Sequence, residues 1–229
     1  MLKLIQGKPI LQHIIERCQA SKADVVQVAT TMNDEDNEIV DLCKELNVLC
    51  YRGDADDVLT RYYCCVRDGY GGKFEHVIRI TADCPLVDPR MIDDLIDIHV
   101  SGKYDITSNC IEETFPDGYD ISIMKVSVLK EAWKHATERS DREHVVPWIL
   151  RQHLKYRIKS VTNDEDLKHW RLTVDHVEDL EVISTIYNAL YSHNQLFGFH
   201  EVYRWLTFNN HVLVSNSMHN RNESCGGLW

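Results

Sequence analysis

Short β-branched segments alternate with amphipathic helical segments over roughly the first 100 residues, and this alternation constrains the fold more than any other feature. Strands are predicted at 25–30, 47–51 and 76–81, and helices at 9–20, 33–46, 55–69 and 88–102. Parallel strands need crossover connections of this length, and such crossovers are right-handed. The pattern therefore predicts an α/β fold with a mainly parallel sheet.

The second half of the chain is predicted to continue the same domain. A Pro-Gly turn at 115–118 separates strands at 104–109 and 119–125. Further helices are predicted at 127–138, 140–153 and 177–193, further strands at 155–161 and 171–175, and a short helix and polar tail from Phe197 on. Ser140 and Glu143 have the spacing of a capping box at the start of a helix. Without repeats or linkers, we predict one domain over 1–229 with an inserted arm or lobe at about 104–148.

The predicted arm is rich in aromatic side chains. It carries Phe115, Tyr119, Trp133 and Trp148, and aromatic anchors of this kind are typical of protein interfaces. This favours a homodimer. The alternative is that the same rings close the core of a monomer.

The charge balance limits the partners of the chain. Its 25 basic and 36 acidic residues give a net charge of −11, which argues against nonspecific binding to nucleic acid and against docking on anionic lipid. A small phosphate-bearing substrate would need a local basic cluster or a divalent cation. No run approaches the ~18 apolar residues of a membrane span, and the N-terminus lacks the pattern of a secretory signal.

The cysteines favour a cytoplasmic protein with reduced thiols. None of the eight forms a C-x-x-C pair, which argues against a thiolate zinc site. Most lie within apolar segments, as expected for reduced thiols in a protein core. They are Cys18, Cys43, Cys50, Cys64, Cys65, Cys84, Cys110 and Cys225.

Two predicted strands each deliver an aspartate to the same edge of the sheet. Asp83 follows the strand at 76–81, and Asp175 ends the strand at 171–175. Ligands of open α/β sheets bind beyond the carboxyl ends of the strands, and paired carboxylates there suit a hard cation such as Mg²⁺. The alternatives are that Asp83 caps a turn and that Asp175 caps the helix that follows. Asp88, before Pro89, is better explained as a helix cap.

Several basic residues have no equally simple structural explanation. Arg79 lies in an apolar strand, where a buried guanidinium needs either an acidic partner or a phosphate. Arg142 and His144 lie in a predicted helix and are not explained by its capping. Arg52 follows another strand, within a common loop tripeptide that is weak evidence by itself.

At these residues the chain resembles the spore-coat polysaccharide biosynthesis protein F group of the acylneuraminate cytidylyltransferase family. The segments that carry the resemblance are GKPI at 7–10, RG at 52–53, DDVL at 56–59, RY at 61–62, RITADCPL at 79–86, TFPDG at 114–118, SDREHV at 140–145, RLTVD at 171–175 and HNRNE at 219–223. The resemblance implies a three-layer, Rossmann-like nucleotide-diphosphosugar transferase fold. It also implies Mg²⁺-dependent transfer of CMP from CTP to a sugar, commonly a sialic-acid-like keto acid, with release of pyrophosphate.

The resemblance also implies roles for single residues. Asp83 and Asp175 would be the catalytic metal ligands. Arg52, Arg79 and Thr81 would line the nucleotide pocket, and Asp117, Arg142 and His144 would face the sugar. Relatives open with a strand and a loop of the type A-R-x-x-S-x-R-L-P-G-K that holds the triphosphate, and this sequence begins after the corresponding point. We therefore expect a sheet that lacks its first strand and a chain whose turnover is impaired.

Two other functions are compatible with the sequence. A glycosyltransferase of the same superfold would use a nucleotide-sugar and often carries a D-x-D motif after a central strand, but here Ala82, Asp83 and Cys84 follow. A non-catalytic subunit that binds sugar-nucleotides would need no phosphate-binding loop.

Overall fold

The computed structural model describes residues 1–219 and 221. Its N-terminal part begins with a small antiparallel hairpin of β1 (Leu4–Ile5) and β2 (Lys8–Pro9), which leads directly into α1 (Ile10–Gln19). Next come β3 (Gln27–Thr31), the 3-10 turn η1 (Asp34–Asp36), α2 (Asn37–Glu45) and β4 (Leu49–Gly53). The strands β3 and β4 pair in parallel, with Gln27 opposite Leu49 and Thr31 opposite Gly53.

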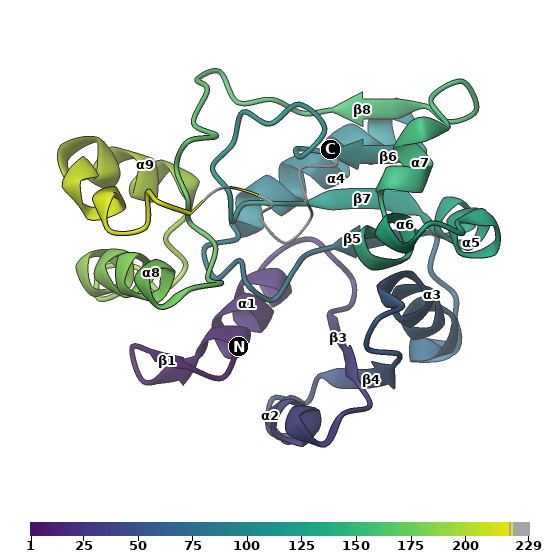
Figure 1. Cartoon of the computed structure of the whole chain (residues 1–229), viewed down its shortest axis with the longest axis horizontal. Coiled ribbons are helices and arrows are strands. Elements are labelled where there is room, and N and C mark those ends of the chain that lie inside the picture. Colours follow the sequence, from purple (N-terminus) through teal and green to yellow (C-terminus); the bar gives the residue numbers. More distant parts are fainter. Residues whose placement is uncertain (220, 222–229) are drawn as a thin grey trace.

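A second sheet has four strands in the order β5-β7-β6-β8. They are β5 (His76–Arg79), β6 (Ile106–Ser108), β7 (Ser122–Lys125) and β8 (Ile158–Ser160). The pair β6–β8 is parallel, whereas β7 runs antiparallel to both of its neighbours. The predicted α/β class is therefore confirmed, and β7 makes the sheet mixed. In Figure 1 the pair β3–β4 lies apart from this larger sheet.

Helices cover both faces of the sheet, which gives three layers. The remaining helical elements are α3 (Val58–Asp68), η2 (Gly69–Gly71), α4 (Pro89–Gly102), α5 (Val126–His135), α6 (Arg139–His144), α7 (Pro147–Arg151), α8 (Val177–Leu190), α9 (Phe199–Phe208) and η3 (Asn210–Val214). Side chains alternate across a strand. Ile123 of β7 packs in the core formed with α1, α4, α8 and α9, and the adjacent Met124 packs in the core formed with α3, α5 and α7.

Capping residues and prolines in the sequence predict the start of α4 correctly but not the bounds of α6 and α7. Asp88 caps α4 by accepting a hydrogen bond from the Arg90 amide at 2.9 Å, and Pro89 occupies the first turn, as predicted. The single helix predicted at 140–153 is wrong, because it divides into α6 and α7. Pro147 lacks the amide that would continue α6, and Val145 between the two helices has a φ of 69°. The Ser140–Glu143 capping box does not form either, since α6 starts at Arg139 without a side-chain cap.

The strand predicted at 171–175 does not form. Only one isolated bridge, between Asp117 and Arg171, occurs there. The following residues bond the loop after β5 instead, because the Val174 amide donates to the Asp83 carbonyl oxygen at 2.9 Å. A ladder cannot extend when successive residues pair with different loops.

The segment 104–148 supplies β6, β7, α5 and α6, and β7 lies between β5 and β6 in the sheet. The division of the chain into one domain with an added lobe stays a prediction. Two of the aromatic residues in this segment are buried, since Phe115 and Tyr119 pack edge-on against Phe199 with ring centres 5.7 and 5.3 Å away. Trp133 is half-buried and stacks on Tyr63 at 4.4 Å.

Two properties of the described residues bear on the setting of the protein. Within 1–219 and 221, no helix combines the length and the apolar character needed to cross a bilayer. In the same part of the chain every cysteine is a free thiol. Cys225 lies outside the described residues.

A pair of imidazoles, His99 and His76, joins α4 to the sheet, and His99 is the buried member. His99 of α4 is 1 % exposed, and its Nδ1 lies 2.9 Å from the Thr107 hydroxyl of β6. Its Nε2 lies 3.1 Å from Nδ1 of His76 in β5. Burial, together with the nearby His76 and Lys125, lowers the pKa of His99 to about 4, although Asp105 acts in the opposite direction.

We expect this histidine to make stability fall in mild acid. In the unfolded chain His99 takes up a proton near its ordinary pKa of about 6.5, whereas the folded protein resists protonation down to about 4. Stability is therefore fully present above about pH 6.5 and is lost toward pH 4, by on the order of 1–2 kcal/mol between about pH 7.5 and pH 5. Urea unfolding at these two pH values measures this loss. His99→Asn should reduce it and exposed His193→Asn should not, and an equal loss in all three proteins would contradict the assignment.

Candidate active site

Three loops meet at the carboxyl end of β5, which is where α/β sheets usually bind their ligands. One follows β5, one joins β6 to β7, and one precedes α8. The carbonyl oxygen of Asp83 accepts hydrogen bonds from the Val174 amide at 2.9 Å and from the Thr173 hydroxyl at 3.2 Å. The loop that carries Asp83 is therefore bonded directly to the segment that ends at Asp175.

The turn at 115–118 is held against the same segment. The Asp117 amide donates to the Trp170 carbonyl at 3.0 Å, and the Leu172 amide donates to the Asp117 carbonyl at 2.8 Å. Gly118 has a φ of 102°, and a Cβ atom there would lie 2.3 Å from the carbonyl oxygen of Leu172. Only glycine fits this close approach, which fixes the position of Asp117 beside the third loop.

Arg171 connects the acids of this edge. Its guanidinium donates to Asp179 at 2.9 and 3.0 Å, to Asp175 at 2.7 Å and to Asp117 at 3.2 Å. The Asp179 side chain is 0 % exposed and also accepts from the amides of Asp175 and His176. Burial alone would raise the pKa of Asp179, but these hydrogen bonds hold it below its ordinary value.

Asp175 itself remains accessible. Its side chain is 49 % exposed, although it is ion-paired with Arg171. The alternative explanation for Asp175, a cap on the following helix, does not describe the structure, because His176 is the N-cap of α8 and Asp179 accepts the hydrogen bonds that complete the cap. Asp175 is thus free of a structural role at the helix terminus.

A second group of acids surrounds Arg221. The guanidinium of Arg221 donates to Asp120 at 2.7 Å and to the Phe115 carbonyl at 3.1 Å, and it lies 3.3 Å from the Glu113 carboxylate. Burial, followed by the Asp120 carboxylate, raises the pKa of Asp117 to about 7 despite Arg221 and Arg171. Burial also raises the pKa of Asp120, and the charge of Asp83 adds to this effect. Burial is the main reason that Asp117 and Asp120 hold their protons more tightly than an exposed aspartate does.

The carboxylates Asp83 and Asp175 have the chemistry that a divalent cation requires. The donors are oxygen atoms only, as Mg²⁺ and similar hard cations require, and two protein carboxylates are a common number for Mg²⁺, which usually keeps water and substrate phosphates as its other ligands. Over residues 1–219 and 221, the structure shows no group of three or more His, Cys, Asp or Glu side chains arranged to hold a metal. Asp83 and Asp175 stay the predicted ligand pair.

Three of the predicted binding residues lie at or near the end of β5. Arg79 is its last residue, and the Arg79 Nε atom is buried without a hydrogen-bond partner among the described residues. Arg79 lies close enough to Asp120 to oppose the rise in the pKa of that acid. His144 lies on α6. Burial is the main cause that lowers the pKa of His144, and the charge of Arg79 lowers it further, whereas Glu143 acts in the opposite direction. Thr81 follows β5, with its hydroxyl 3.2 Å from the Cys84 sulfur.

Arg52 lies near the carboxyl end of β4, in the separate two-stranded sheet. Its guanidinium donates to the carbonyls of Thr31 and Asn33 at 2.9 and 2.8 Å and to the Asn37 side chain at 2.7 Å. These contacts hold the loop after β3. In this structure all three guanidinium nitrogens of Arg52 therefore donate to protein groups, and Arg52 stabilises the loop after β3.

Arg142 is placed away from the other predicted sugar-binding residues. Its guanidinium bonds Asp57, which caps α3, the Thr60 hydroxyl at 2.5 Å and the Trp133 carbonyl at 2.8 Å. It thereby joins α3, α5 and α6. Asp117 and Asp175 share Arg171, and the charge of Asp83 acts on Asp117, whereas Arg142 has the contacts of a structural residue.

Sequence reasoning assigned no role to Arg171, Asp179, Asp120 and Arg221. Arg171 and Arg221 occur in the segments RLTVD and HNRNE, but these segments indicate no role for either residue. Asp179 is typical of the acids found in the first turn of a helix. One local signal was available, because Arg171, Asp175 and Asp179 are spaced four residues apart. The contact of Arg221 with Asp120 joins residues 101 positions apart, so no local pattern could reveal it.

Comparisons with known proteins identify the family of the chain. The cytidylyltransferase family model matches residues 1–207. An uncharacterized protein of Methanocaldococcus jannaschii is 34 % identical over 176 residues, which is 76 % of this chain and 70 % of that protein. Spore coat polysaccharide biosynthesis protein SpsF of Bacillus subtilis is 27 % identical over 195 residues, covering 82 % of this chain and 79 % of that protein.

Solved structures agree with the sequence comparisons. A cytidylyltransferase from Leptospira borgpetersenii superposes with a TM-score of 0.86 and 25 % identity, covering 93 % of this chain and 88 % of that one. A CMP:2-keto-3-deoxy-manno-octonic acid synthetase in complex with CTP shares the fold, with a TM-score of 0.58, 15 % identity and coverage of 82 % and 91 %.

Proposed function

Since the chain belongs to the cytidylyltransferase family, we propose that it transfers CMP from CTP to a hydroxyl group of an acidic keto-sugar and releases pyrophosphate. The observation that carries the proposal is the direct bonding of the Asp83 loop to the segment that ends at Asp175. Two carboxylates at the carboxyl edge of an α/β sheet suit a metal-dependent reaction of a nucleoside triphosphate. SpsF, by its name, acts in spore coat polysaccharide biosynthesis, which supports a product used in surface glycans.

In this proposal Asp83 and Asp175 hold a divalent cation, with Mg²⁺ as the first candidate. When bound, the cation neutralises charge that builds up on the phosphate oxygens. Arg79, with a buried Nε that lacks a partner, provides a donor for the nucleotide. Thr81 and the loop held by Arg52 form the wall of the nucleotide pocket.

The reaction needs positioning more than covalent chemistry by the protein. The sugar hydroxyl oxygen attacks the α-phosphorus and forms a new O–P bond, and its proton is released to solvent. The bond between the α-phosphorus and the bridging oxygen breaks in line as pyrophosphate leaves. In this proposal Asp117, which feels the charge of Asp83, and His144, which feels the charge of Arg79, orient the sugar. Asp120 and Arg221 fix the loop that carries Asp117.

The proposal is tested by measuring pyrophosphate release from each of the four ribonucleoside triphosphates with a panel of keto-sugar acids. We expect release to require a divalent cation and an acceptor sugar and to be fastest with CTP. Release that is equal with all four nucleotides would refute the assignment of CTP. Consumption of a nucleotide-sugar without pyrophosphate release would favour a glycosyltransferase instead.

The proposed setting is the cytoplasm, where CTP is made, and the free thiols of Cys18, Cys43, Cys50, Cys64, Cys65, Cys84 and Cys110 accord with a reducing compartment.

We also propose that the protein is a homodimer. Phe115 and Tyr119 serve the core of the subunit, so the support comes from Trp133 and Trp148, which are half-buried, and from Leu154, which is 94 % exposed. Light scattering at micromolar concentration should give about twice the chain mass of 26.7 kDa. A mass of one chain at all such concentrations would contradict the dimer.

A further inference from the structure

The carboxylate of Asp83 is held by the cysteine that follows it in the chain. Cys84 lies in the loop after β5 and is 2 % exposed. The Cys84 Sγ atom donates a hydrogen bond to Asp83 Oδ1 over 3.3 Å. Among residues 1–219 and 221, no other side chain donates a hydrogen bond to this carboxylate. The rotation of the Asp83 carboxylate therefore depends on one buried thiol.

The sulfur of Cys84 has a second partner in Thr81. The Thr81 hydroxyl oxygen lies 3.2 Å from Cys84 Sγ. Burial raises the pKa of the Cys84 thiol, so the sulfur keeps its single proton near neutral pH. Because an ionised carboxylate can only accept, this proton is donated to Asp83, and the Thr81 hydroxyl donates to the sulfur. The three side chains form two consecutive hydrogen bonds that both donate toward the Asp83 carboxylate.

The backbone holds the thiol in place beside Asp83. The Cys84 amide donates to the Thr81 carbonyl at 3.4 Å, and the Val87 amide donates to the Cys84 carbonyl at 3.2 Å. The Tyr187 hydroxyl of α8 donates to the Pro85 carbonyl at 2.7 Å. The turn that carries Cys84 is thus bonded within itself and to a helix, which limits the positions open to the sulfur.

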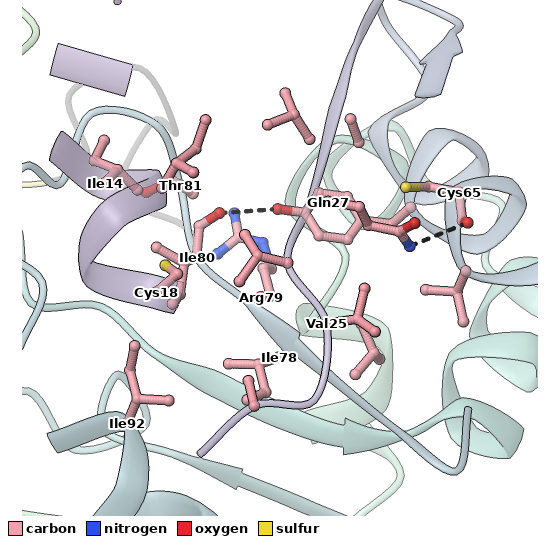
Figure 2. A pocket seen from close by; sticks show the side chains of 18 of the residues that line it. Ile14, Cys18, Val25, Gln27, Cys65, Ile78, Arg79, Ile80, Thr81 and Ile92 are labelled. Atoms are coloured by element: carbon pink, nitrogen blue, oxygen red, sulfur yellow. Dashed lines mark hydrogen bonds between the residues drawn. The ribbon is translucent and has the colours of Figure 1, made fainter. Parts of the chain in front are cut away.

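The thiol itself is set back from open space. Thr81 lines a cavity of about 520 Å³, and Figure 2 shows Thr81 following Ile80 where the chain leaves β5. Cys84 does not line this cavity. Because Cys84 is buried and outside the cavity wall, it acts on a ligand through Asp83 and not by direct contact.

We propose that Cys84 is a positioning residue for the Asp83 carboxylate and that Thr81 sets the direction of the thiol proton. This rests on the proposed function, in which Asp83 and Asp175 hold a divalent cation. The hydrogen bond to Oδ1 fixes the carboxylate so that Oδ2 can face the cation. Groups that orient a metal ligand in this way typically change metal affinity by about 10–100-fold when they are removed.

The role of the thiol is tested by Mn²⁺ binding to the full chain without nucleotide, followed through the electron paramagnetic resonance signal of the free ion. Cys84→Ala is expected to weaken Mn²⁺ binding at least about tenfold, and Cys84→Ser, which keeps a donor, should recover most of the affinity. Cys65→Ala is the matched control, since it removes another buried thiol, from α3. It should leave Mn²⁺ binding unchanged, and the two alanine variants should lose similar amounts of stability.

A second measurement examines the hydrogen bond without any metal. The Raman band of the Cys84 S–H stretch is identified by its loss in Cys84→Ala. In Asp83→Ala this band should move to higher frequency, because the thiol loses its acceptor, whereas Asp175→Ala should leave it in place.

Equal Mn²⁺ affinity of Cys84→Ala and the unmodified chain would overturn the proposal, as would an S–H band that does not respond to Asp83→Ala. If the unmodified chain binds no Mn²⁺, the role of Cys84 toward a cation is overturned as well. None of these measurements depends on turnover. A chain that shows both expected effects but transfers no CMP would refute the proposed reaction and leave the role of Cys84 standing.

Discussion

Replacing Asp83 by asparagine is expected to lower kcat by at least about 10³-fold, which corresponds to roughly 4 kcal/mol of transition-state stabilisation. Asparagine has nearly the same size as aspartate, and the backbone carbonyl of residue 83 can still accept from Thr173 and Val174. The substitution removes one negative charge from the proposed cation site. Asp175→Asn should have an effect of the same kind, because the second carboxylate is removed instead. Steady-state pyrophosphate release over a series of Mg²⁺ concentrations measures both variants.

The dependence on metal concentration distinguishes a ligand from a structural residue. Both variants should need more Mg²⁺ for half-maximal activity, while their unfolding curves stay close to that of the unmodified chain. Asp97→Asn is the matched control, since Asp97 is 64 % exposed and pairs with Lys22 on the surface. If Asp83→Asn and Asp97→Asn retain equal activity, Asp83 does not bind the metal.

The second large effect concerns stability and the arginine at the centre of the site. Arg171→Met is expected to reduce the free energy of unfolding by about 3–5 kcal/mol, because it leaves the fully buried carboxylate of Asp179 without its cation. Arg171→Lys should recover only part of this loss, since an ammonium group cannot bond Asp179, Asp175 and Asp117 together. Urea unfolding near neutral pH measures the series.

A double-mutant cycle separates the ion pair from lost packing. Adding Asp179→Asn to Arg171→Met removes the stranded charge, so the double variant should be more stable than the sum of the two single changes predicts. Arg67→Met is the control, because Arg67 pairs with Asp68 on the surface and its loss should change the stability far less. Additive losses in the Arg171 cycle would show that the pair is not coupled.

The elements with strong local signals could be predicted from the sequence. The cap and proline at Asp88–Pro89 located the start of α4, and the alternation of strands and helices predicted the α/β class. The segment at 171–175 has the composition of a strand, yet its amides bond loops that lie far away in the sequence. The antiparallel direction of β7 is likewise a matter of non-local pairing, with β5 and β6.

The candidate site could be predicted only where residues follow a strand directly. Thr81 and Asp83 belong to this group, and Arg79 is the last residue of the strand itself, so the end of β5 determines the position of all three. Arg142 was assigned to the sugar from a motif, while the structure commits its guanidinium to Asp57 and Trp133. The acid cluster around Arg171 and Arg221 depends on four segments meeting in space, which periodicity cannot show.

The most direct test of the proposed reaction follows the label from CTP that is labelled at its α-phosphate, in the presence of Mg²⁺ and a keto-sugar acid. Transfer of CMP predicts that the label appears in a sugar nucleotide and that unlabelled pyrophosphate forms in equal amount. Asp83→Asn should abolish both products together. Label that remains in CTP with every acceptor sugar, or that appears only in free CMP, would contradict the assignment of this chain as a cytidylyltransferase acting on sugars.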